Sequence, residues 1–307
     1  MARPVLVVHG GAEPFLEEVQ SEERMELGHA GLRRALEAGY AVLQTGGLAL
    51  DAVTEAVKQL EDDPLFNAGR GASFTRIATH EMDASVMDGR DRRAGAVAGV
   101  CGPRHPVLAA RAVMERTSHV MLAGAGANQF CRDAGLELCE PSWFDTPFRL
   151  AELQSALAQS DHGTVGAVAL DLQGNLAAAT STGGTTAKLP GRVGDSPVIG
   201  AGTWAANGVC AVSSTGHGEF FIRYAAAHEV YGRMKWGGMS VQQAADSLVN
   251  ETLREAGAEG GVIAVSAAGD IAMPFNCAGM FRGYAQDGVA HTAILQDVRT
   301  TPLSATR

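Results

Sequence analysis

The chain has 307 residues, of which 46% are apolar and 19% charged, a composition typical of a globular protein that can bury a sizeable core. Its formal charge of −10 and the lack of a lysine-rich or aromatic-interleaved run argue against a nucleic-acid partner. No apolar run approaches the roughly 20 residues that a membrane helix needs, so we expect no membrane association.

The five cysteines are scattered, and none forms a Cys-x-x-Cys pair. They therefore predict neither a disulfide framework nor a zinc site. Strand-like residues 4–8 begin so close to Met1 that we expect no signal peptide. The resulting expectation is a cytoplasmic protein in a reducing compartment.

The first part of the chain predicts strands and helices in turn. Residues 4–8 form a short apolar run that ends in a glycine turn, typical of a buried strand. Apolar residues at helical spacing predict two helices, around 32–43 and 53–60. Residues 61–84 lose this periodicity and predict a long loop with short strands. Further expected elements are a strand at 95–100 and a helix at 106–116.

Residues 120–133 offer a dinucleotide-binding alternative. A strand-like run leads into Gly124-Ala125-Gly126 and a helical segment, as in a phosphate-binding turn. However, the third glycine of that pattern is replaced by Gln129, and the segment does not open a βαβ series. We therefore favour a plain strand–turn–helix connection, and a nucleotide-dependent protein is the weaker hypothesis.

The second half of the chain is dominated by predicted strands. Residues 151–163 are polar and weakly patterned, which predicts an exposed, cleavable linker. Farther on, Ser240 and Gln243 form a capping box that predicts the start of a helix. Strands are expected at 164–171, 176–181, 198–202, 208–214, 261–266, 270–275 and 289–295, with a helix at 220–233. This order predicts two packed sheets with helices on both outer faces.

Gly163 and Thr164 are the candidate reactive pair. Cleavage between them would place a hydroxyl nucleophile and an α-amine, with a reference pKa of about 7.7 to 8.0, on the same residue. That amine could act as the base near neutral pH. Gly163 has no Cβ, which leaves its carbonyl open to attack. A Gly-Thr pair alone is more typical of an ordinary turn before a strand, so the neighbouring motifs decide.

Several motifs occur in a fixed order around this pair. They are His9-Gly10-Gly11-Ala12, residues 163–171, 175–184, 189–202 and 213–223, and Met273-Pro274-Phe275-Asn276. Together they resemble the plant-type asparaginases, also called isoaspartyl peptidases, a branch of the N-terminal-nucleophile hydrolases. The resemblance implies one α+β domain over 1–307, a four-layer αββα sandwich. It also implies autocleavage into 1–163 and 164–307, and a dimer of cleaved αβ units.

The resemblance assigns catalytic roles to residues around Thr164. Thr182 would orient the nucleophile, and Asn67 would lie near it. The Thr215 hydroxyl and the Gly216 backbone N–H would form the oxyanion hole. Donors held in place where negative charge develops are each worth roughly a hundredfold to a thousandfold in rate, so these residue types suit the chemistry.

Arg192 and Asp195 are the candidate substrate clamp. A guanidinium can grip an α-carboxylate with two parallel hydrogen bonds, and a nearby carboxylate can hold an α-ammonium. In the family that the motifs resemble, this loop binds the aspartyl group, with Thr215, Gly216 and backbone contacts from Gly184 and Gly218. The implied substrates are L-asparagine and β-aspartyl dipeptides.

The resemblance also implies a structural sodium ion, although no cofactor is expected for the chemistry. The ligands would be the backbone carbonyls of Leu60, Glu61, Asp63, Phe66, Ala68 and Arg70. A loop of carbonyls suits a hard cation, and a plain glycine turn is the alternative. Position 13 is Glu where similar enzymes have Gly, so the loop there could run differently.

Other chemistries find little support. The nine histidines lack metal-pair spacing and are interpreted as ordinary core or surface residues. There is no Gly-x-Ser-x-Gly elbow of a serine hydrolase. A glycosylasparaginase is the nearest alternative hydrolase. A non-catalytic scaffold remains the alternative from another class, although it does not explain why the candidate site residues occur together.

Overall fold

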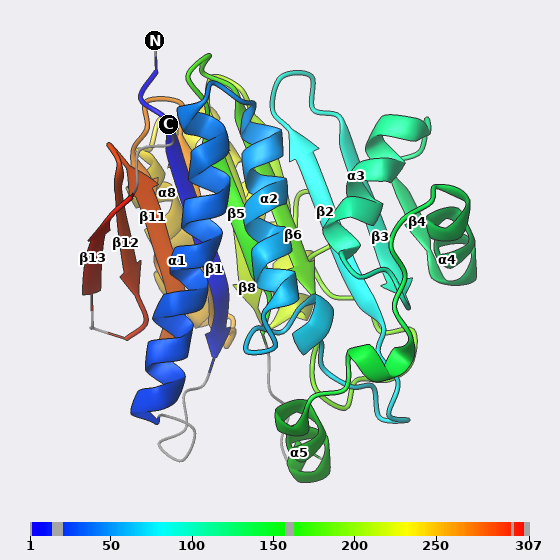
Figure 1. Cartoon of the computed structure of the whole chain (residues 1–307). Helices are drawn as coiled ribbons and strands as arrows, with labels where there is room; N and C mark the ends of the chain where they lie inside the picture. The colour runs from blue at the N-terminus through cyan, green and yellow to red at the C-terminus, as the bar shows by residue number, and fades with distance from the viewer. Residues whose placement is uncertain (1, 14–20, 157–162, 296–297, 304–307) are drawn as a thin grey trace.

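The computed structural model describes residues 2–13, 21–156, 163–295 and 298–303, which form two stacked β-sheets between two layers of helices (Figure 1). The larger sheet contains, in spatial order, β13 (Val298–Pro302), β12 (Val289–Ala293), β11 (Gly279–Gln286), β1 (Val5–Glu13), β5 (Val165–Leu170), β6 (Leu176–Thr182), β2 (Met82–Asp88), β3 (Ala94–Val100) and β4 (Met121–Ala123). The smaller sheet contains β10 (Ile271–Ala272), β9 (Gly260–Ser266), β8 (Cys210–Gly216) and β7 (Thr203–Ala206). Among these strands, neighbours pair antiparallel except β3 and β4.

Side-chain alternation along the strands separates the layers of the core. In β1, Leu6 and Val8 pack with the outer helices, whereas Val5 and Val7 point into the space between the sheets. In β9 of the other sheet, Val262 and Ala264 face outward and Ile263 and Val265 face inward. Because successive residues of a strand point to opposite faces, one strand supplies two apolar layers. The predicted α+β, four-layer αββα sandwich is confirmed.

Helices cover both outer faces. In Figure 1, α1 (Glu22–Gln44), α2 (Ala49–Asp62) and α3 (Pro106–Arg116) lie in front of the larger sheet. Helices α7 (Ala226–Lys235) and α8 (Val241–Ser247) pack on the smaller sheet. The remaining helical segments are η2 (Gly69–Gly71), α4 (Gly124–Asp133), η3 (Pro141–Trp143), α5 (Pro147–Ala156), α6 (Gly218–Arg223) and the π-helix η4 (Leu248–Leu253). The predicted capping box of Ser240 and Gln243 is present at the start of α8.

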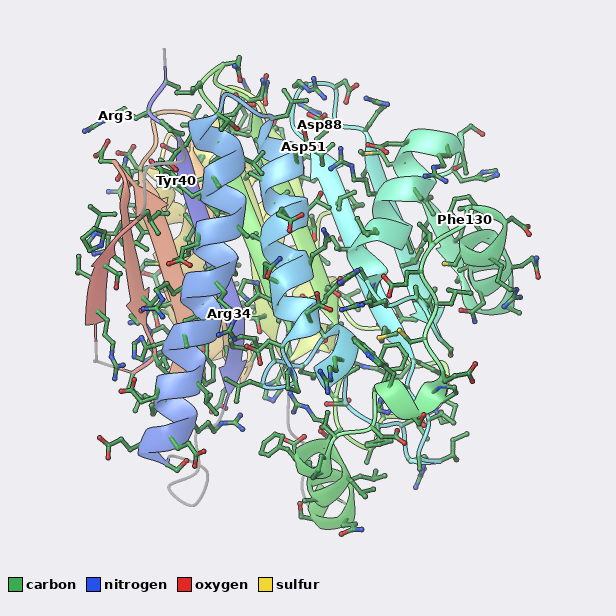
Figure 2. All side chains as sticks on the ribbon, viewed as in Figure 1. Arg3, Arg34, Tyr40, Asp51, Asp88 and Phe130 are labelled. Carbon is green, nitrogen blue, oxygen red and sulfur yellow. The ribbon has the colours of Figure 1, made fainter. Side chains whose placement is uncertain are left out.

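Charged side chains gather on the outer helices and the loops (Figure 2). Arg34, labelled on α1, donates to Asp63 Oδ2 at 2.6 Å, just beyond the end of α2. Within the described part of the chain, no helix combines the length and the apolar character needed to cross a membrane.

Four expectations about secondary structure are wrong. Residues 198–202 form turns rather than a strand, because Gly200 has φ +93° and the Gly202 N–H bonds back to Val198 O. The expected helix at 220–233 is broken at Ala225, which has φ +47°. The expected strand at 270–275 is only Ile271–Ala272.

The fourth concerns the predicted linker at 151–163. Its first residues belong to α5, because Arg149 is buried and anchors this helix to the carbonyl of Gly71. Residues 157–162 of the predicted linker lie outside the described residues. At position 13 the backbone continues as a strand, with Glu13 paired to Gly279.

Candidate active site

The candidate catalytic residues converge where the inner strands end. Thr164 directly precedes β5, Thr182 ends β6, and the pairing of Val165 with Ser181 brings the two threonines side by side. One narrow pocket is lined by Gly163, Thr164, Thr182, Gly184, Thr185, Arg192, Gly194, Asp195 and Gly216. The fold therefore brings the predicted nucleophile, oxyanion and clamp residues to one place.

The Thr164 hydroxyl lies in a short chain of hydrogen bonds. It donates to Thr182 Oγ1 at 3.3 Å, and the Thr182 hydroxyl donates to the carbonyl oxygen of Gly163 at 2.8 Å. Thr182 Oγ1 also accepts from the Gly184 N–H at 2.9 Å. Thr182 is therefore held in one orientation between the nucleophile and the bond that precedes it.

Asn67 contacts the same carbonyl from the other side. Its Nδ2 donates to Gly163 O at 2.9 Å and to Gly184 O at 2.6 Å, and its Oδ1 accepts from the Ser73 N–H at 2.8 Å. Asn67 is buried, so these bonds fix its amide. The Gly163 oxygen thus receives two donors, from Asn67 and Thr182.

Gly216 lines the pocket, whereas Thr215, which precedes it on β8, is fully buried. Thr215 Oγ1 accepts from the Ala12 N–H at 3.1 Å, which leaves the Thr215 hydroxyl proton available to another acceptor. Gly216 has φ +141°, and a Cβ at this position would overlap the carbonyl oxygen of Glu259. Only glycine suits both this backbone conformation and this close approach.

The Arg192 guanidinium presents one edge to Glu219 and the other edge to the pocket. Its Nε and Nη2 donate to Glu219 Oε1 and Oε2 at 2.9 and 3.0 Å. The Nη1 side lies toward the pocket, since a Cβ on Gly184 would be 3.3 Å from Nη1. One edge is thus used to orient the guanidinium, and the other can receive a carboxylate.

Asp195 lies beside this guanidinium. Its side chain is buried, and Oδ2 has no hydrogen-bond partner among the described residues. Burial raises the pKa of Asp195 to about 7, although the Arg192 charge acts in the opposite direction. A Cβ on Gly218 would lie 2.8 Å from Asp195 Oδ1, so this glycine contacts the clamp closely. An ammonium group at Oδ2 would supply the missing partner.

Two buried residues of opposite charge that sequence analysis did not identify, Lys188 and Asp83, lie behind the clamp. The Lys188 ammonium donates to the carbonyl of Glu81, and Asp83 Oδ1 accepts from the Gly99 N–H at 2.8 Å. Burial lowers the pKa of Lys188 and raises that of Asp83, and each charge partly offsets the effect on the other. Both residues connect the clamp loop to the larger sheet.

His9 is a third residue to which sequence analysis gave no catalytic or binding role. It is a core histidine, as expected, but its Nδ1 lies 3.0 Å from the carbonyl oxygen of Thr164. Burial lowers the pKa of His9 to about 3, so the ring is neutral. The motif His9-Gly10-Gly11-Ala12 could have indicated this role from the sequence. Gly11 of the same motif also lies against the backbone of Thr164.

The predicted sodium loop closes tightly on its own backbone. A Cβ on Gly69 would overlap Glu61 O, and a Cβ on Gly71 would overlap Phe66 O. The Glu61 side chain is engaged elsewhere, because its Oε1 accepts from Ser181 Oγ at 2.6 Å. Burial raises the pKa of Glu61 to about 8. Three of the predicted ligands, the carbonyls of Asp63, Phe66 and Ala68, accept backbone hydrogen bonds within the loop itself, and the sodium site stays a prediction.

Two other parts of the molecule resemble binding sites but lie apart from this pocket. Gly124–Gly126 form the first turn of α4, which follows the edge strand β4 directly, so the segment is a plain connection from strand to helix. A wider, mainly apolar hollow of about 790 Å³ is lined by residues that include Arg24, Leu27 and Phe148. Its lining contains none of the predicted catalytic or substrate-binding residues, so we assign the chemistry to the smaller pocket around Thr164.

Comparison with known proteins agrees with this site. A family model described as asparaginase matches residues 2–161 and 154–294. The isoaspartyl peptidases of Salmonella typhimurium and Escherichia coli K12 are each 50% identical, over 94% of this chain and 97% or 95% of their own. The isoaspartyl peptidase/L-asparaginase of Homo sapiens is 42% identical over 97% of this chain and 98% of its own. The resemblance indicated by the motifs is confirmed, and the chain belongs to the asparaginase family.

Proposed function

We propose that this protein hydrolyses the side-chain amide of L-asparagine and the isopeptide bond of β-aspartyl dipeptides. The observation that carries the proposal is that Thr164, Arg192 and Asp195 line one narrow pocket. A reactive hydroxyl and the two charges that recognise a free amino-acid end can thus contact one small ligand. The names of the relatives support the same activity.

The first step in this proposal is release of Thr164 as an N-terminal residue. Its hydroxyl attacks the carbonyl carbon of Gly163, the C–N bond breaks, and the hydroxyl proton moves to the departing α-nitrogen. Water then opens the ester, which separates 1–163 from 164–307. Asn67 and Thr182 support this step, because both donate to the oxygen on which negative charge develops.

In the substrate reaction, the free α-amine of Thr164 takes the proton of its own hydroxyl, and the oxygen attacks the β-carbonyl. The Thr215 hydroxyl and the Gly216 N–H are suited to hold the resulting oxyanion. Collapse expels ammonia or an amine, which receives the proton from the Thr164 ammonium. Water hydrolyses the remaining ester and regenerates the hydroxyl.

Substrate selectivity follows from the clamp. Arg192 would hold the α-carboxylate and Asp195 the α-ammonium, so the β-carbonyl is the electrophile directed at Thr164. The leaving group lies outside the clamp, which accommodates both ammonia and the amine of a second amino acid. An α-linked aspartyl peptide has no free α-carboxylate, and loss of such a charge partner costs about 3–5 kcal/mol, roughly a thousandfold in kcat/KM.

Three further properties belong to the same proposal. A sodium ion held by carbonyls within 60–70 would stiffen the loop that carries Asn67. The expected location is the cytoplasm. The working form is expected to be a homodimer of cleaved αβ units, and light scattering that reports a single αβ unit would contradict it.

The function is tested with purified protein and four substrates: asparagine, β-Asp-Leu, α-Asp-Leu and an asparagine-linked sugar. We expect turnover of the first two and essentially none of α-Asp-Leu. Equal rates on α- and β-linked Asp-Leu would show that the clamp is wrongly assigned. Preferential release of the sugar would instead support the glycosylasparaginase alternative.

A further inference from the structure

A buried row of polar side chains lies behind the catalytic residues, between the two sheets. We call His9, Ser85, Thr180, Thr203 and Ser213 the polar row, and all five side chains are fully buried. On the larger sheet, strand register aligns the members His9, Thr180 and Ser85, from β1, β6 and β2, with Gly166 of β5 between His9 and Thr180. On the smaller sheet, Thr203 pairs with Ser213. Residues far apart in sequence thus form one continuous layer.

Hydrogen bonds connect every member of the row. The distances are 2.9 Å from His9 Nε2 to Ser213 Oγ, 2.7 Å from Ser213 to Thr180, 2.6 Å from Thr180 to Thr203, and 2.7 Å from Thr203 to Ser85. The row alternates between the sheets, because Ser213 and Thr203 come from the smaller one. It therefore fixes the spacing of the two sheets at this level.

The direction of the protons in the row follows from its first member. A carbonyl can only accept, so the bond to Thr164 O requires the proton of the neutral His9 ring to be on Nδ1. Nε2 must then accept from Ser213, Ser213 from Thr180, and Thr180 from Thr203. One arrangement of protons satisfies these three bonds, and the single Ser85 proton is then shared between Thr203 Oγ1 and the carbonyl oxygen of Ser196.

Gly166 leaves the space that the row needs. A Cβ at this position would overlap both Ser213 Oγ and His9 Nε2. Its φ is not in the left-handed region, so the close approach, rather than backbone conformation, explains the glycine. An alanine here would add one methyl group in the middle of the hydrogen bonds.

One end of the polar row contacts the nucleophile side of the pocket, and the other end contacts the clamp side. One end is His9, which holds the carbonyl of Thr164. At the other end, Ser85 Oγ lies 2.6 Å from the carbonyl oxygen of Ser196, the residue after Asp195. In addition, Thr180 is two positions from Thr182, and Ser213 two positions from Thr215, on the same strand faces.

We infer that the polar row sets the distance between the Thr164 hydroxyl and the Arg192–Asp195 clamp, and thereby selects a substrate whose amide is on the β-carbon. This inference rests on the proposed function. Glutamine carries the same α-groups, but its amide is one methylene farther from them. A row of rigid length excludes that amide from the position that the nucleophile attacks.

The test compares asparagine and glutamine in Thr180→Val, which keeps the shape of the side chain and removes its hydroxyl. A displacement of about 1 Å costs roughly a hundredfold in rate, so we expect kcat/KM for asparagine to fall by about that factor. Glutamine turnover should fall less, which lowers the asparagine preference by roughly tenfold or more. Thr180→Ser, which keeps the hydroxyl, should restore the preference.

Thr292→Val is the matched control. Thr292 is a buried threonine of β12 that bonds to the imidazole of His29 at 2.8 Å, outside the polar row. Its loss should lower thermal stability in a similar way without changing the ratio of asparagine to glutamine turnover. A Thr180→Val protein with an unchanged ratio would overturn the inference.

Self-cleavage must be separated from turnover, so rates are normalised to the cleaved chain seen on a denaturing gel. If Thr180→Val is not cleaved, Thr203→Val, one hydroxyl farther from the nucleophile, is judged by the same ratio. Gly166→Ala adds a methyl group inside the row instead of removing a hydroxyl. It should also lower the ratio of asparagine to glutamine turnover. If wild-type protein hydrolyses asparagine but cleaved Thr180→Val, or Thr203→Val in its place, keeps the asparagine preference, only the inference fails. If wild type hydrolyses neither asparagine nor β-Asp-Leu, the proposed function itself fails.

Discussion

The two sides of the pocket are built from different kinds of interaction. Around Thr164 the groups are neutral: the hydroxyl of Thr182, the amide of Asn67, the imidazole of His9 and backbone carbonyls. They are buried, and their hydrogen bonds join residues of several strands. This side is ordered before any ligand arrives.

The clamp side is charged and incomplete. Arg192 is oriented by the exposed carboxylate of Glu219, and Asp195 keeps one oxygen without a hydrogen-bond partner in the described structure. A buried carboxylate without a partner is costly, and a substrate ammonium would relieve that cost. The neutral side therefore positions the reacting groups, and the charged side recognises the substrate. Changes on the two sides should therefore affect different measurements.

The largest effect is expected from Thr164→Ala. Loss of the nucleophile should abolish both self-cleavage and turnover, the latter by roughly a millionfold, as for other covalent catalysts that lose their nucleophile. The measurements are band number on a denaturing gel and ammonia release from asparagine. Thr164→Ser keeps a hydroxyl and should retain part of both. A Thr164→Ala chain that is still cut after Gly163 would contradict the assignment.

Arg192→Ala should affect substrate turnover but not self-cleavage. Self-cleavage should proceed, because the hydrogen bonds to the Gly163 carbonyl come from Asn67 and Thr182. In contrast, kcat/KM for β-Asp-Leu should fall about a thousandfold, since the substrate carboxylate loses its charge partner. Arg192→Lys keeps the charge without the bidentate geometry and should lose less. If Arg192→Ala remained uncut, the two sides would not be independent.

Asp195 predicts a pH dependence. Its raised pKa, about 7, means that the carboxyl is protonated below that pH and no longer attracts the substrate ammonium. The Thr164 amine, with a reference pKa of about 7.7 to 8.0, must also lose a proton to act as base. Below pH 7, log kcat/KM should thus rise with pH at a slope near two.

Asp195→Asn should reduce that slope to about one and lower kcat/KM at neutral pH by about a hundredfold, because a charged hydrogen-bond partner is lost. Pre-steady-state or steady-state rates across pH 5 to 9 provide the measurement. An unchanged slope would mean that groups other than Asp195 cause the fall of kcat/KM at low pH.

The pattern of residues within short stretches of the sequence predicted many helices and strands of this molecule. Helix α3 was predicted at its observed bounds, because Pro106 marks a first helical turn and the apolar spacing continues to Arg116. The candidate site residues could also be named, because each belongs to a motif of the family. Their convergence in one pocket depends on strand register, which a motif does not contain.

The remaining features depend on contacts between distant strands. His9 and Ser213 are 204 positions apart, and nothing near either residue in sequence reveals their hydrogen bond. The apolar run at 198–202 predicted a strand, but its glycines allow turn bonds that replace a ladder. The pairing of Glu219 with Arg192 likewise arises only when α6 begins beside the clamp loop.

Glu219 provides the smallest and most selective test of the charged side. Its carboxylate is 60% exposed, and exposed ion pairs typically contribute under about 1 kcal/mol. Because it holds the Nε and Nη2 edge of Arg192, Glu219→Ala should let the guanidinium rotate and raise KM for asparagine by no more than about fivefold. Self-cleavage and kcat should be unchanged, and Glu219→Gln, which keeps one acceptor, should lie in between. A lower KM in Glu219→Ala would reverse the interpretation, because it would mean that Glu219 competes with the substrate carboxylate for Arg192 rather than orienting it.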